Sequence, residues 1–194
     1  MSFRSTTVAD VFVERLFDPP LGTAELESMP RSRSARLSAR GVTWRESFLD
    51  RSGRRMLCRF EAPDEASLRD ALEQERVQVE ELWAGTVHGL GGSTLAESTA
   101  AGESPVLVQH RVEEPITSSH LRTVESLCTW CLETHRIRLV RMLLSLDLRR
   151  IVYLYRAPDA ESVRLAHRQA GLELDVVWPY HEVAGCLPDG RDGA

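Results

Sequence analysis

Apolar and polar residues roughly alternate in a short run near the start of each half of the chain. The two runs are 11–17 (VFVERLF) and 105–112 (PVLVQHRV). Alternation with a period of two is typical of a strand with one buried face, and β-branched residues favour strands as well. We therefore predict that each half of the chain opens with a β-strand.

A helix is the next predicted element in both halves. The pattern favours helices from residue 23 to about residue 40 and from residue 118 to about residue 135, each with a hydroxyl side chain as N-cap. Gly41 is a suitable stop for the first helix because glycine adopts the left-handed conformation that commonly ends helices. Arg136 stands at the corresponding place in the second half.

The rest of each half predicts a strand hairpin, a second helix and a last strand. An Ala-Pro-Asp turn follows the hairpin, where proline ends the strand and Asp64 or Asp159 can cap the next helix. The expected strands are 42–49, 55–61 and 77–83 in the first half, and 137–144, 151–156 and 172–178 in the second. Each half therefore has the order βαββαβ, the ferredoxin-like arrangement.

The two halves also align with each other without a gap. Residues 11–83 fall on 106–178, so that RMLCRFEAPDEASLRDALEQ (55–74) meets RIVYLYRAPDAESVRLAHRQ (150–169). Self-similarity of this kind indicates an internal repeat. We predict a first repeat at 8–84, a Gly/Ser/Ala-rich linker at 85–104, a second repeat at 105–184 and a flexible tail at 185–194.

A single ferredoxin-like repeat leaves one face of its sheet apolar and in need of a partner. Two copies in one chain supply that partner, so the sheets should pack face to face as an intrachain pseudodimer, like a dimeric α/β barrel. The predicted fold class is therefore α+β, with two tandem ferredoxin-like repeats. The space between sheet and helices, or between the sheets, is the natural pocket.

Composition and charge narrow the classes of function. The net charge is −5, which argues against a nucleic-acid binder because such proteins usually present a basic face. All 24 basic residues are arginine, which excludes lysine chemistry and indicates the codon bias of a GC-rich, actinobacterial genome. No signal peptide and no long apolar run is evident, so we expect a cytoplasmic protein without a membrane partner.

The stretch CTWCLETH (128–135) carries two cysteines and a histidine with the spacing of one helical face. A redox role is disfavoured because Cys128 lies well inside the predicted helix, far from the free amides that lower a thiol pKa. Metal binding is possible for part of the set, although residues seven apart are separated by about 10 Å along a helix. The alternative is a core stripe in which Cys128 and Cys131 act as small hydrophobes, and neither Cys131 nor His135 is assigned a role.

The hairpin with the EAPD turn, in VTWRESFLDRSGRRMLCRFEAPDEASLR (42–69), resembles family 4242 of the domains of unknown function, and the second repeat has RAPD instead. That ferredoxin-like family includes small actinobacterial nickel-binding proteins. The resemblance implies ligand positions on the first strand, the first helix, the third strand and the second helix. In the second repeat these positions hold His110, Glu125, Cys128, Tyr153 and His167; in the first they hold Arg15, Pro30, Arg33, Cys58 and Leu72.

The first functional hypothesis is therefore a cytosolic protein that binds a transition metal in the second repeat. The proposed ligands are His110 and His167, with Glu125 and Cys128 as further candidates. Imidazole and thiolate ligands suit nickel, zinc or copper. No nucleotide cofactor is expected because the chain has no phosphate-binding loop or dinucleotide fingerprint. A homodimer of pseudodimers is compatible with this hypothesis.

Two further hypotheses remain open. Barrels of this kind often act as cyclases, isomerases or oxygenases on small apolar substrates without a cofactor, which is an analogy from the fold. The acid/base candidates would then be His110, Tyr153, His167 and Glu61, and Arg15 could pair with Glu61 or anchor an anionic substrate. A binding module without chemistry is the third hypothesis.

Overall fold

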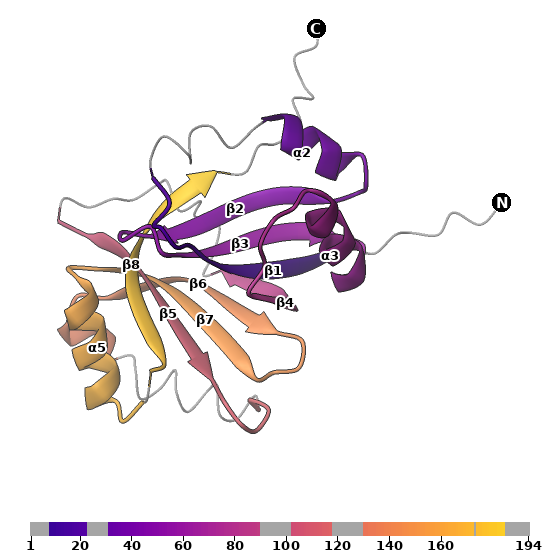
Figure 1. Cartoon of the computed structure of the whole chain (residues 1–194). Coiled ribbons are helices and arrows are strands. Elements are labelled where there is room, and N and C mark those ends of the chain that lie inside the picture. The colour runs from indigo at the N-terminus through magenta and orange to yellow at the C-terminus, as the bar shows by residue number, and fades with distance from the viewer. Residues whose placement is uncertain (1–7, 23–30, 90–101, 118–129, 173, 185–194) are drawn as a thin grey trace, which may run out of the picture. The chain divides into compact units, whose positions relative to one another are not determined.

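A computed structural model describes residues 8–22, 31–89, 102–117, 130–172 and 174–184 (Figure 1). The chain divides into two compact units. Unit 1 comprises Met1–Gly85 with His181–Ala194, and unit 2 comprises Thr86–Tyr180. None of the helices in the described ranges has the length and hydrophobicity that a bilayer-spanning helix requires.

Unit 1 contains an antiparallel sheet with strand order β4–β1–β3–β2. Two helices, α2 and α3, pack on one face of this sheet (Figure 1). The element bounds are β1 (Ala9–Leu16), α2 (Arg31–Ser38), β2 (Thr43–Asp50), β3 (Arg55–Ala62), α3 (Glu65–Gln74) and β4 (Glu81–Gly89). This strand order is that of the ferredoxin-like fold.

Unit 2 has the same order, β8–β5–β7–β6, again antiparallel throughout. Its elements are β5 (Ser104–Arg111), β6 (Arg138–Ser145), β7 (Arg150–Ala157), α5 (Ala160–Gln169) and β8 (Val176–Ala184), and residues 130–134 are helical. Each strand of unit 2 has the bounds of its counterpart in unit 1 under the gapless alignment of the halves. The predicted fold class, α+β with two tandem ferredoxin-like units, is confirmed.

The second helix of each unit begins as the sequence predicts. Asp64 and Asp159 are both extended, and each accepts a hydrogen bond of 2.7 Å from the backbone N–H three residues later, in Ser67 and Ser162. These bonds lower the pKa of both carboxyl groups. The carboxylate satisfies one of the free amides at a helix N-terminus, which explains why the same Ala-Pro-Asp turn recurs.

The C-terminal ends of these two helices share a hydrogen-bonding motif. The N–H of Val77 bonds the carbonyl of Leu72, and the N–H of Leu172 bonds that of His167, both at 2.9 Å. This is the Schellman motif, which requires a left-handed residue just after the helix. Gly171 has a φ of 71° in unit 2, whereas Arg76 has a φ of 54° in unit 1. The predicted ends at Gly41 and Arg136 are confirmed likewise, with φ values of 72° and 55°.

Substitutions of the left-handed residue of this motif should change the stability of the two units in opposite directions. We expect Arg76→Gly to raise the free energy of unfolding by about 1 kcal/mol, because glycine has no Cβ penalty in the left-handed region. Gly171→Ala should lower it by about 1 kcal/mol through the backbone alone, since a Cβ there would meet no atom within 4 Å. Denaturant unfolding of both variants tests this; equal changes of the same sign would contradict it.

The predicted last strands, 77–83 and 172–178, are wrong in position. They run later, as β4 from Glu81 and β8 from Val176. In unit 1 the chain leaves the Schellman motif at Val77, and ladder pairing with β1 starts only where Glu81 faces Glu14. The alternation of VQVEELW therefore includes a connection as well as a strand. The predicted repeat boundary at residue 84 falls within β4, and residues 90–101 and 185–194 lie outside the described part.

The apolar side chains of each unit gather between sheet and helices. In unit 1 the alternate residues Val11 and Val13 of β1 meet Leu68 and Leu72 of α3. In unit 2 their counterparts Val106 and Val108 belong to one cluster with the helix residues Val163 and Ala166. Cys131 is also in this cluster, 4% exposed, so the core interpretation of that cysteine is confirmed.

Candidate functional site

Tyr153, Tyr155 and His167 meet on the helix-covered face of unit 2, and His110 lies on the same face. His110 is near the end of β5, in phase with Val108, and Tyr153 faces Val108 across the β5–β7 ladder. Tyr155 lies two residues further along β7, and His167 comes from α5. Strand alternation and the helical stripe therefore bring four polar aromatic side chains into an otherwise apolar layer.

His167 and Tyr155 form the buried centre of this group. The imidazole Nε2 lies 3.0 Å from the Tyr155 hydroxyl oxygen, and the residues are only 1% and 2% exposed. The two rings meet edge to face with centroids 5.6 Å apart, and the ring of Tyr153 lies 6.1 Å from the imidazole. The expected inward orientation of His167 is confirmed.

Burial decides the charge of His167. Burial is the larger cause and the nearby His110 the smaller one, and together they lower the pKa of the imidazole from 6.5 to about 4. The ring is therefore neutral at pH 7 and has one nitrogen with a lone pair. Its Nδ1 atom is buried and has no hydrogen-bond partner among the residues that the structure describes.

His110 contributes a second imidazole on the same side of the sheet. Its side chain is 26% exposed, and its Nδ1 lies 3.8 Å from Oδ2 of Asp175, beyond hydrogen-bond distance. The same carboxylate oxygen accepts the backbone N–H of Arg111. Within the described ranges the buried Nδ1 of His110 also lacks a hydrogen-bond partner.

The Nδ1 atoms of His110 and His167 are suitable ligands for a transition metal, but two ligands are fewer than a complete set. Neutral imidazoles are common ligands of nickel, copper and zinc, and an unpartnered buried nitrogen is available to bind one. The described residues contain no group of three or more His, Cys, Asp or Glu side chains arranged to hold an ion. The two further predicted ligands, Glu125 and Cys128, lie outside the described part of the chain.

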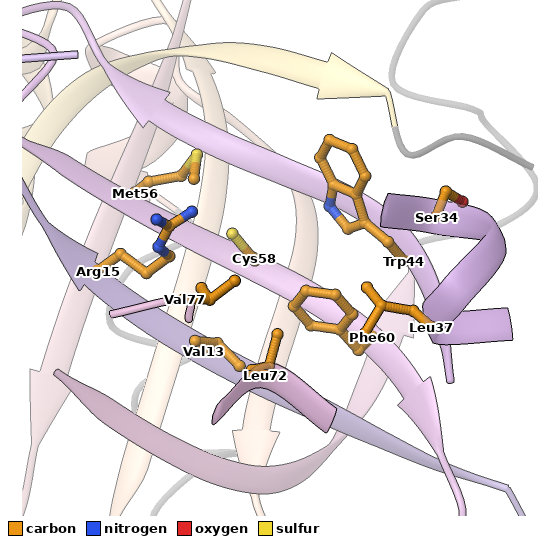
Figure 2. A pocket seen from close by; sticks show the side chains of 10 residues that line it. All are labelled: Val13, Arg15, Ser34, Leu37, Trp44, Met56, Cys58, Phe60, Leu72 and Val77. Carbon is orange, nitrogen blue, oxygen red and sulfur yellow. The ribbon is translucent and has the colours of Figure 1, made fainter. Parts of the chain in front are cut away.

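Unit 1 has a cavity at the corresponding place (Figure 2). It measures about 40 Å³ and is lined mainly by apolar side chains, together with Arg15 and the thiol of Cys58. Burial raises the pKa of Cys58, against smaller opposing effects of a hydrogen bond to Ser47 and the charge of Arg15. The thiol is therefore protonated at neutral pH.

The gapless alignment relates the cavity lining to the unit 2 cluster position by position. Arg15 corresponds to His110, Cys58 to Tyr153, Phe60 to Tyr155 and Leu72 to His167. All four positions of unit 1 line the cavity. The positions that line the cavity in unit 1 with mostly apolar groups thus hold imidazole and phenol groups in unit 2.

The predicted pairing of Arg15 with Glu61 is wrong. In the β1–β3 register Arg15 faces Met56, whereas Glu61 faces Asp10 near the other end of the ladder. Arg15 instead donates from Nε to the carbonyl of Gln78 at 3.1 Å, and Glu61 forms an ion pair with Arg45. Glu61 thus has a structural partner within unit 1.

Tyr155 belongs to this cluster although it was not among the predicted metal ligands or acid/base residues. Its signal was available, because the aligned position in unit 1 is Phe60 and the exchange adds one hydroxyl at a buried site. A buried hydroxyl requires a partner. Asp175, beside His110, had no comparable signal because it lies in a connection before β8.

A protein-family model matches part of the chain. The model of the family described as "Nickel responsive protein SCO4226-like" matches residues 12–84. This segment is less than half of the chain and lies in the first predicted repeat. No curated protein matches the sequence.

Solved structures resemble the chain over most of its length. A provisionally named chlorite dismutase, TA0507, is 13% identical, with a TM-score of 0.50, covering 91% of this chain and 95% of its own. A chlorite dismutase variant from Candidatus Nitrospira defluvii is 9% identical, with a TM-score of 0.48 and 92% coverage of both chains. At such identity the first likeness concerns the fold alone, and it agrees with the dimeric α/β-barrel class that the sequence predicts.

Proposed function

We propose that this chain is a cytoplasmic protein that binds a transition metal ion, nickel in the first place, through His110 and His167 of unit 2. The observation that carries the proposal is the pair of buried imidazole Nδ1 atoms without a hydrogen-bond partner among the described residues. A buried polar atom left without a partner is costly, and a bound ion would remove that cost.

The protonation state of His167 supports the same proposal. A metal ligand must offer a lone pair, and an imidazole with a pKa of about 4 does so without first losing a proton at pH 7. The ion would supply a positive charge with open coordination positions. The resemblance to nickel-binding proteins adds Glu125 and Cys128 as further ligands in the proposal.

The family match points to the same metal. It covers residues 12–84, although the residues of ligand type are richer in unit 2. We infer that unit 1 keeps the sequence features of the family whereas unit 2 keeps the imidazole ligands. Cys58 and Arg15 in the unit 1 cavity make that space a weaker candidate, because a protonated thiol and a guanidinium both oppose cation binding.

An enzyme acting on an apolar substrate is less well supported. The unit 1 cavity, at about 40 Å³, is far smaller than the cavity of about 150 Å³ that holds a benzene ring in an engineered protein. A polycyclic substrate does not fit into that space. In unit 2 the unpartnered Nδ1 atoms of His110 and His167 support ion binding over the alternative of an acid/base enzyme.

Metal loading tests the proposal. The wild type, incubated with Ni(II), Zn(II) or Cu(II) and desalted, should retain about one ion per chain by elemental analysis. The His110→Ala/His167→Ala variant should lose that ion because both imidazoles are removed. If it retains the wild-type content, the proposal is wrong. His110→Ala/His167→Leu is a second variant, since leucine fills the corresponding position of unit 1.

A matched control separates this site from surface histidines. His88 and His181 are both exposed. The His88→Ala/His181→Ala variant should therefore keep the wild-type metal content. Loss of the ion in this control variant would contradict the proposed site.

A further inference from the structure

We propose that Tyr155 is the positioning residue of the unit 2 site, whose hydroxyl fixes His167 in the tautomer with hydrogen on Nε2 and so presents the lone pair of Nδ1 to an ion. This inference rests on the proposed function. It goes beyond it by naming the nitrogen that binds and the residue that selects it.

The contact itself is direct and buried. Nε2 of His167 and the Tyr155 hydroxyl oxygen are 3.0 Å apart, with both residues at most 2% exposed. Tyr155 belongs to the β-sheet and His167 to helix α5, so the bond also fixes the ring relative to the sheet. At this burial a water molecule cannot easily replace the hydroxyl.

The unpartnered Nδ1 indicates which nitrogen has the hydrogen. If the hydroxyl donated to Nε2, Nδ1 would carry a buried N–H without an acceptor among the described residues. If the hydroxyl instead accepts from Nε2, Nδ1 carries a lone pair and no hydrogen. Orphaned buried N–H groups are rarer than under-satisfied acceptors, so for the imidazole the second arrangement costs less. It also leaves the nitrogen that a cation needs.

Unit 1 supports a link between the hydroxyl and the imidazole. The positions of Tyr155 and His167 are held there by Phe60 and Leu72, which both line the cavity. The phenol and the imidazole are therefore present together in one unit and absent together in the other. Phe60 shows that a ring without a hydroxyl can fill this position where no histidine is present.

The expected size of the effect follows from other metal sites. A ligating histidine almost always donates its second N–H to an oxygen, which fixes the tautomer and raises the basicity of the ligand nitrogen. Loss of such a partner typically weakens metal binding about 10–100-fold. We expect Tyr155→Phe to lower Ni(II) affinity by this factor while ring packing is kept.

Two measurements on the full chain test the inference. Long-range ¹H–¹⁵N NMR of the metal-free protein reports which imidazole nitrogen has the hydrogen, and Ni(II) titration reports affinity. The wild type should show hydrogen on Nε2, and Tyr155→Phe should shift the ring toward the other tautomer and bind Ni(II) about 10–100-fold more weakly. Tyr153→Phe, which removes the neighbouring hydroxyl, is the matched control and should keep the Nε2 tautomer.

A variant pair excludes a merely structural role. In the His167→Leu background, Tyr155→Phe recreates the Phe60/Leu72 pair of unit 1 and should cause no additional loss of Ni(II) affinity. An equal loss in both backgrounds would overturn the inference, as would an unchanged tautomer and affinity in Tyr155→Phe alone. Absence of Ni(II) binding by the wild type would instead contradict the proposed function. In that case the imidazole tautomer of the Tyr155→Phe variant would still test whether Tyr155 fixes the ring of His167.

Discussion

Between pH 6.5 and pH 4 the free energy of unfolding of the wild type should fall by about 3 kcal/mol because of His167. The His167→Leu variant should not show this fall. The imidazole is neutral in the folded protein until the pH approaches 4, whereas in the unfolded chain it takes up a proton near its ordinary pKa of 6.5. The unfolded state therefore binds more protons in this window, so the free energy of unfolding falls as the pH falls. At about 1.4 kcal/mol for each pH unit, the difference between the two pKa values amounts to roughly 3 kcal/mol.

Urea unfolding of the two proteins at several pH values between 7 and 4.5 checks this result. Leucine is a suitable replacement because Leu72 occupies the corresponding position of unit 1. Asp64 and Asp159, whose pKa values are lowered, lose their stabilising effect below pH 3.8 and are common to both proteins. Parallel pH profiles for the wild type and His167→Leu would show that His167 is not buried as a neutral ring. His181→Ala should keep the wild-type profile.

Replacing Arg59 with methionine should lower the free energy of unfolding by about 3 kcal/mol, because it removes the cation that pairs with the buried Glu46 and the half-buried Asp10. Arg59 donates from Nε to Asp10 at 2.7 Å and from Nη1 to Glu46 at 3.0 Å. The side chains are 19%, 23% and 10% exposed, so water screens these pairs only in part. Methionine keeps the aliphatic volume while it removes the charge.

Arg55→Met provides the control for this substitution. Arg55 lies on the same strand and is exposed, so its replacement should change stability by less than about 0.5 kcal/mol. Denaturant unfolding of both variants at pH 7 gives the comparison. A loss for Arg59→Met no greater than that of Arg55→Met would mean that the ion cluster contributes little to unit 1.

The repeated fold could be predicted because the local signals of each half agree. Strand alternation, the capping aspartates after proline and the helix stops at Gly41 and Arg136 all fall on corresponding positions. The last strands were misplaced because VQVEELW has strand character throughout. Only ladder pairing with β1, which begins at Glu81, decides where the strand starts, and this partner is distant in sequence.

The candidate site was predictable in its histidines and less so in their partners. His110 and His167 could be assigned to inward positions from the alternation of β5 and the stripe of α5. Their hydrogen-bonding environment depends on register between strands, which also explains why Arg15 faces Met56 and not Glu61. The role of the Tyr155 phenol could not be predicted locally, because its hydroxyl comes within 3.0 Å of the imidazole only when α5 packs on the sheet.

X-ray absorption of the nickel-loaded protein tests the central claim most directly. If His110 and His167 bind the ion, the nickel spectrum should show scattering from about two imidazole rings with nitrogen near 2.0–2.1 Å. The same signal should be absent from any nickel that remains with the His110→Ala/His167→Ala variant. A wild-type spectrum without imidazole scattering, or one that this variant leaves unchanged, would contradict a metal site at these two histidines.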